Sequence, residues 1–193
     1  MAEKQRSVKM VLLTNIPTMG GLVAILQARG TFNHEEMGLE FWPGGCHVTV
    51  KGGVMEGEGF FSALLKGTAE ELGDKVYGDL QNLMRTNQLV ILNERWSPEK
   101  DTPIYGMIIP PEMIADFRLG PSSGGLRFVG QDGARVIGDL REIEEDATIP
   151  NGYIAMFPDE KQAVLLAFEK LAPKNGIDAM IISIGAEQPP PKQ

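Results

Sequence analysis

Residues 52–73, with the sequence GGVMEGEGFFSALLKGTAEELG, decide the fold of this chain. The stretch opens with a Gly-Gly turn and an acidic loop, continues as a helix and closes with two adjacent carboxylates and a glycine. Its bulky apolar residues recur at helical spacing; they are Phe60, Phe61, Leu64, Leu65 and Leu72. We therefore expect one face of this helix to pack on a core.

Three further positions of the helix lie together beside that apolar stripe. At about 100° per residue, positions 67, 70 and 71 fall within an arc of roughly 100°. Glu70 and Glu71 are thus expected to share a space next to the glycine-rich entry. Carboxylates and backbone carbonyls are hard oxygen donors, which suit Mg²⁺ or Mn²⁺ bridged to a phosphate. A solvated helix end before a glycine cap remains the alternative interpretation.

The spacing of this stretch resembles the Nudix box, G-x5-E-x7-R-E-U-x-E-E-x-G-U, in which U is a bulky aliphatic residue. The match needs no gap. Gly52 aligns with the first Gly, Glu58 with the first Glu and Lys66 with the Arg. Glu70 and Glu71 align with the paired Glu, and Gly73 aligns with the last Gly. An earlier start at Gly44 or Gly45 fails, because no Glu stands six residues beyond either glycine.

The departures from the box concern its charged and aliphatic positions. Lys66 replaces the Arg, so the rigid fork that pairs a carboxylate bidentately is lost. Gly67 stands where the family has a Glu that is usually a metal ligand, and Thr68 and Asp74 occupy the aliphatic positions. Because a glycine inside a helix costs about 1 kcal/mol relative to Ala, the sequence predicts that Gly67→Glu adds a ligand without loss of stability.

The resemblance implies an α/β fold, the Nudix sandwich, with a mixed central sheet between helices and the box as a loop-helix-loop. We expect one domain over residues 1–186 and a disordered tail at 187–193. The implied activity is hydrolysis of a pyrophosphate in a nucleoside diphosphate linked to another moiety. Glu70, Glu71 and the carbonyl of Gly52 would bind Mg²⁺ or Mn²⁺, and Glu58 would pair with Lys66 to brace the box.

Other site residues follow less directly from the resemblance. Family members often supply a further acid from beyond the box as base or ligand, and Glu112 and Asp132 are the candidates here. Arg127, within the Gly/Ser-rich residues 119–133, is the candidate cation for a substrate phosphate. His34 is assigned no metal. Because Gly67 removes a ligand, the alternative function is a Nudix-fold nucleotide-binding or regulatory module that has lost turnover.

Composition limits the partners. The chain has 18 basic and 26 acidic residues. Because no Lys or Arg run is present, duplex nucleic acid and an anionic membrane are not expected to bind. The expected partner is a small-molecule nucleotide, with a homodimer left open. A single cysteine, Cys46, excludes an internal disulfide. We find neither a signal peptide nor a membrane span, and expect a cytoplasmic protein.

Hydrophobic patterning outside the box predicts the remaining elements. Strands are expected at residues 9–16, 21–28, 47–51, 88–93, 103–109 and 176–185, and helices at residues 79–85, 110–117 and 158–171. The first two strands should form a hairpin, since turn residues separate them. Residues 30–45 and 119–133 are predicted to be loops, and the acidic run at 139–146 a solvated face.

Overall fold

The computed structural model describes residues 5–19, 21–34, 36–86, 89–96, 100–130, 134–136, 154–156 and 158–172. One mixed sheet contains the strands β1 (Gln5–Ile16), β2 (Gly21–Arg29), β5 (Cys46–Val48), β6 (Val50–Gly53), β7 (Val90–Trp96), β8 (Lys100–Ile109), β9 (Ser123–Val129), β10 (Ala134–Val136) and β11 (Ile154–Met156). A separate hairpin joins β3 (Phe32–Asn33) to β4 (Gly38–Leu39). The helices are α1 (Phe60–Leu72), α2 (Asp74–Arg85) and α4 (Pro158–Leu171), with short 3-10 turns η1 (Pro17–Met19) and η2 (Pro111–Asp116).

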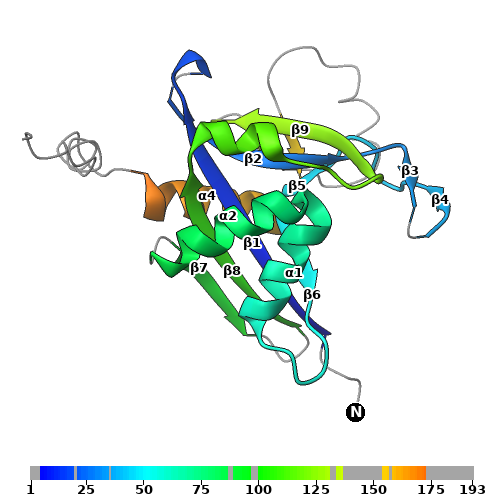
Figure 1. The fold of residues 1–193 in the computed structure, drawn as a ribbon. Helices are drawn as coiled ribbons and strands as arrows, with labels where there is room; N and C mark the ends of the chain where they lie inside the picture. Colours follow the sequence, from blue (N-terminus) through cyan, green and yellow to red (C-terminus); the bar gives the residue numbers. More distant parts are fainter. Residues whose placement is uncertain are drawn as a thin grey trace, which may run out of the picture.

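Helices cover both faces of the sheet (Figure 1). The side chains of β1 show this directly: Met10 and Leu12 pack in a core with α1 and α2, whereas Val11 and Leu13 pack in a second core with α4. Such alternation is the period of a strand that is buried on both sides. The predicted sandwich of a mixed sheet between helices is therefore confirmed. No helix in the described part of the chain is both long and apolar enough to cross a membrane.

Most of the predicted elements are present, and the first hairpin and α4 have nearly the expected bounds. The segments predicted as loops differ. Residues 123–129 form β9, which pairs with β2, and residues 30–45 contain β3 and β4. Short strands escape notice when Gly and Ser interrupt their pattern. The predictions for residues 139–146, 176–185 and 187–193 lie outside the described residues.

The buried face of α1 is also different from the one expected. Leu64, Leu65 and Leu72 are buried, but Phe61 is 49% exposed, so its predicted burial is wrong. Ala63, Gly67 and Thr68 lie on the inner face in its place. The helix approaches β6 through these small residues, which turns Phe61 outward.

The sheet opens between its first two strands. β1 and β2 pair as far as Leu12 and Ile25, after which β6 pairs with β1 and β5 pairs with β2. Val48 packs in the α4 core and Val50 in the α1 core, although residues two apart in a regular strand face the same side. The irregularity lies at Thr49. Thus β5 and β6 form one continuous stretch of chain that fills a wedge between β1 and β2.

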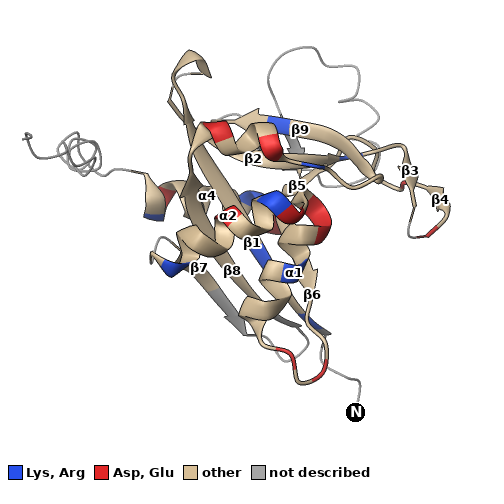
Figure 2. Ribbon diagram, viewed as in Figure 1, with Lys and Arg blue, Asp and Glu red and all other residues tan. Residues whose placement is uncertain are grey.

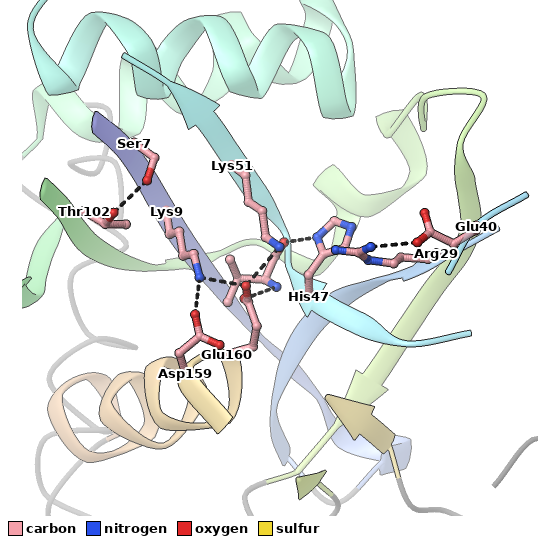
Figure 3. Close-up of polar contacts among 10 residues, drawn as sticks. Ser7, Lys9, Arg29, Glu40, His47, Lys51, Thr102, Asp159 and Glu160 are labelled. Atoms are coloured by element: carbon pink, nitrogen blue, oxygen red, sulfur yellow. Dashed lines mark hydrogen bonds and ion pairs between the residues drawn. The ribbon is translucent and has the colours of Figure 1, made fainter. Parts of the chain in front are cut away.

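A buried acid on α4 occupies the wedge (Figure 3). Glu160 Oε2 accepts a hydrogen bond from the backbone N–H of Val48 at 3.0 Å. Its Oε1 lies 2.8 Å from Lys9 Nζ and 2.9 Å from Lys51 Nζ, while the side chain is only 4% exposed. Asp159, at the start of the same helix, also contacts Lys9 at 2.8 Å. Two lysines and one peptide N–H therefore compensate the desolvation of the buried Glu160 carboxylate.

Removing the Glu160 charge should destabilise the fold strongly. In Glu160→Gln, the amide can still accept from Val48, but Lys9 and Lys51 lose their buried partner. We expect a loss of about 3–5 kcal/mol in the free energy of unfolding, measured by urea denaturation. Asp159→Asn, whose side chain is 48% exposed, is the matched control and should cost less than about 1 kcal/mol. Equal losses of unfolding free energy in the two variants would show that the burial of Glu160 does not explain its contribution to stability.

The same acid predicts how stability changes with pH. Burial by itself would raise the pKa of Glu160, but Lys51 and Lys9 lower it from 4.5 to about 2. A depressed pKa stabilises the folded state above pH 4.5, and this contribution is lost as the pH falls toward 2. The stability gap between wild type and Glu160→Gln should therefore close by about 3 kcal/mol across that window, at 1.36 kcal/mol per unit. A gap that stays constant from pH 7 to pH 3 would contradict the assignment.

Candidate active site

A cleft of about 540 Å³ lies between the end of α1 and the strands β2, β5 and β6, where acidic segments of α1 face β5 (Figure 2). Thirteen residues, most of them polar, line it: Gln27, Arg29, Asn33, His34, Glu40, His47, Lys51, Glu70, Glu71, Gly120, Pro121, Ser122 and Ser123. The structure therefore brings the paired Glu of the box to a concave site, as the sequence predicts.

The two box carboxylates are held differently. Gln27, which is buried, donates one hydrogen bond from Nε2 to Thr49 O at 2.9 Å and a second to Glu71 Oε2 at 3.2 Å. This amide fixes Glu71 against the floor of the cleft. The side chain of Glu70 is 62% exposed and lies 3.9 Å from Lys66 Nζ, one helical turn earlier. Glu71 is thus the positioned carboxylate, and Glu70 is free to reorient.

Gly67 does not face the cleft, which corrects the placement expected from the helical arc. A Cβ at this position would lie 2.5 Å from the carbonyl oxygen of Lys51 and 3.3 Å from Cα of Gly52. A Cβ at Gly52 would in turn meet the carbonyl oxygen of Ala63 at 2.6 Å. The two glycines let α1 and β6 pack backbone against backbone. The expectation that Gly67→Glu costs no stability is therefore wrong, because the added side chain meets a backbone carbonyl.

The other residues predicted around the box are dispersed. Lys66 contacts Glu70, and Glu58 accepts hydrogen bonds from the N–H of Met55 and the hydroxyl of Ser62, so the described contacts do not join Glu58 to Lys66. The box loop is held instead by Arg6, which donates to the Glu58 carbonyl at 3.3 Å and lies 4.9 Å from the Phe60 ring centroid.

Neither Glu112 nor Arg127, two of the residues predicted beyond the box, lines the cleft. Glu112 lies in η2 and lines a separate cavity of about 480 Å³ beside Asp116. Arg127 is exposed on β9 and donates to the carbonyl of its neighbour Leu126. Asp132 lies outside the described residues. Of the predicted site residues, the structure brings together Glu70 and Glu71 in the cleft, with Gly52 on the strand against which their helix packs.

Sequence analysis missed the basic side of the cleft. Lys51 lines it while paired with Glu160, and Arg29 lines it with Nη1 2.8 Å from Glu40 Oε1. These residues come from β6 and β2, and Figure 3 shows Lys51 and Arg29 converging on either side of His47. Alternation along β2 could have placed Arg29 with Gln27 on one face, but not opposite a helix whose position was unknown.

His47 is a neutral imidazole in this cleft. Its Nδ1 lies 2.8 Å from the carbonyl oxygen of Val48, and a carbonyl only accepts, so Nδ1 carries the proton of this hydrogen bond. Burial lowers the pKa of His47 to about 4, and the charges of Lys51 and Arg29 act in the same direction. The Val48 carbonyl and Glu160 oppose that shift. At pH 7 the ring is therefore uncharged.

The donor set of the cleft fits a loosely held divalent cation. Among the described residues, no group of three or more His, Cys, Asp or Glu side chains is placed to hold a metal ion. Glu70 and Glu71 offer hard oxygen donors from α1, whereas Gly52, the third ligand that the sequence predicts, is not among the residues that line the cleft. Such a set suits Mg²⁺ or Mn²⁺ that keeps several waters and takes further oxygens from a substrate phosphate.

Comparison with known proteins supports the architecture. No protein-family model matches the sequence, and no curated protein matches it. Solved structures do match. A MutT/nudix family protein from Listeria innocua is 16% identical over 94% of this chain and 99% of that one, with a TM-score of 0.57. A NUDIX hydrolase from Alicyclobacillus acidocaldarius is 12% identical over 94% of this chain and 97% of that one, with a TM-score of 0.53. A MutT/nudix family protein from Enterococcus faecalis also matches (14%, 89% of this chain, TM-score 0.55), and this chain spans 63% of its length. At these identities the likeness concerns the fold. The opened sheet, the box helix beside it and the structural matches together show that this chain has the Nudix fold.

Proposed function

We propose that the cleft hydrolyses the pyrophosphate bond of a nucleoside diphosphate linked to another moiety, with Mg²⁺ or Mn²⁺. The observation that carries the proposal is the position of Glu71, fixed by Gln27 in a cleft that also contains Glu70, Lys51 and Arg29. A volume of about 540 Å³ is in the usual range for a small-molecule site.

The charges of the cleft are suited to a phosphate that arrives with a cation. Glu70 and Glu71 come from α1, whereas Lys51 and Arg29 come from the sheet. A divalent ion at the carboxylates would neutralise phosphate oxygens and favour water attack at phosphorus. Lys51 and Arg29 would then bind the remaining phosphate oxygens and orient the substrate between the two sides.

The alternative, a nucleotide-binding module without turnover, is favoured by the missing third carboxylate. The missing carboxylate is weak evidence for lost turnover, because the packing of Gly67 against Lys51 gives this position a structural reason to be glycine. Two carboxylates with a substrate phosphate still provide oxygen ligands for one ion. We therefore favour the hydrolase.

A screen for turnover tests this choice. Mass spectrometry over nucleoside diphosphate sugars, dinucleoside polyphosphates, ADP-ribose and NADH, with Mg²⁺ and with Mn²⁺, should reveal hydrolysis of at least one class. Glu71→Gln should lower kcat/KM by on the order of 100-fold, because the positioned carboxylate is lost. Glu112→Gln, in the separate cavity, is the control and should leave kcat/KM unchanged.

Calorimetry provides a second readout that does not require turnover. Mg²⁺ should bind weakly to the free protein, and Glu70→Gln plus Glu71→Gln should abolish that binding. Tight Mg²⁺ binding that survives both substitutions would place the ion elsewhere. Nucleotide binding without hydrolysis across the whole screen would favour the module.

The structural role of Gly67 is tested by a pair of glycine-to-alanine variants. Gly67→Ala should lower the free energy of unfolding by about 1–3 kcal/mol, since its Cβ meets the Lys51 carbonyl and forces a shift. Gly78→Ala, in α2 with nothing within 4 Å of its added Cβ, should instead stabilise by about 0.5–1 kcal/mol. Urea denaturation measures both. Stabilisation by both alanines would remove the packing explanation for Gly67.

A further inference from the structure

His47 leaves one ring nitrogen available in the cleft. Because Nδ1–H is bound to the Val48 carbonyl, the lone pair of the neutral ring is on Nε2. No described residue donates a hydrogen bond to Nε2, although the side chain lines the cleft together with Glu70 and Glu71. A backbone carbonyl that fixes one nitrogen is the usual way to hold the other in a working orientation.

The proposed hydrolysis needs a group that takes a proton from the attacking water. Five side chains of the cleft could do so: His34, Glu40, His47, Glu70 and Glu71. Three of them already have another role. Glu40 is bound by Arg29 and by the N–H of Trp42, and Glu70 and Glu71 are the proposed cation ligands.

The two histidines differ in their surroundings. His34 is exposed in the loop after β3, whereas His47 lies on the floor of the cleft between the charges of Lys51 and Arg29. Burial above all, and then the charges of Lys51 and Arg29, lower the pKa of His47 against the opposing effect of Glu160, so the ring is unprotonated at neutral pH. A lone pair that stays available, beside groups suited to phosphate, is what a base for water requires.

We propose that His47 Nε2 is the general base of this site, a role that rests on the proposed hydrolase function. Water forms a bond to phosphorus as its proton moves to Nε2, and the bond from phosphorus to the bridging oxygen breaks. The bridging oxygen leaves with the electron pair as part of the second phosphate. His47 then returns the proton to solvent.

A direct role as metal ligand is less consistent with the geometry. In the part of the chain that the structure describes, His47, Glu70 and Glu71 do not form a group able to hold one ion. His47 comes from β5, while the carboxylates come from α1. The distinction can be measured, because a base remains unligated when Mg²⁺ binds.

Kinetics of His47→Gln test the role on a substrate found in the screen. Gln can still donate a hydrogen bond but is not a base, so kcat should fall by about 10²–10⁴-fold while KM changes little. Added imidazole should restore part of the activity of His47→Ala, which a merely structural side chain would not allow. Lys75→Gln, on α2 and outside the cleft, is the control, with kcat unchanged. An unchanged kcat in folded His47→Gln would overturn the base role and leave the hydrolase standing.

Nuclear magnetic resonance of the imidazole nitrogens gives a readout on the wild-type protein, independent of activity and of variant folding. The two histidines are assigned by comparison with His34→Gln. At pH 7 the His47 ring should be neutral with the proton on Nδ1, and saturating Mg²⁺ should not shift its Nε2 signal. A proton on Nε2, or coordination of Nε2 by Mg²⁺, would overturn the base role. Absence of wild-type turnover on every substrate class would overturn both this role and the hydrolase.

Discussion

The buried carboxylate of Glu160 holds the place where the sheet opens. Where β1 and β2 part, the chain at Val48 and Thr49 crosses from one strand to the other and loses regular ladder partners. Buried peptide groups without partners are costly, so side chains supply the hydrogen bonds. Glu160 binds the N–H of Val48, Gln27 binds the carbonyl of Thr49, and the Thr49 hydroxyl donates to the Ile25 carbonyl. Without these contacts the wedge, and the cleft above it, would have no stable form.

The same contacts connect the core to the site. Gln27 binds both the Thr49 carbonyl of the wedge and Glu71 of the cleft. Lys51 compensates Glu160 inside the protein and also lines the cleft. For Lys51, burial outweighs the attraction of Glu160 and lowers its pKa, whereas Lys9, held by two carboxylates, has a raised pKa. Substitution of the wedge residues therefore changes the charge and the geometry of the site together with stability.

The sequence was sufficient for those features that depend on local pattern. Box spacing placed Glu70 and Glu71 together beside a concave site, and periodicity found the first hairpin and α4. The basic residues of the cleft and His47 could not be found in this way, because their convergence depends on the irregular step at Thr49. Strand alternation alone cannot show that β5 pairs with β2 whereas β6 pairs with β1. The close contact of Gly67 with β6 is likewise a property of two segments in space, and it is this contact that turns Phe61 outward.

The backbone contact between α1 and β6 also bears on how such a site changes over evolutionary time. Once Gly67 and Gly52 allow the helix and strand to close together, any side chain at either position meets a carbonyl oxygen of the opposite element. An acid at position 67 therefore requires the helix to move away from the strand. Changes in the chemistry of the cleft are therefore expected at residues on its other walls.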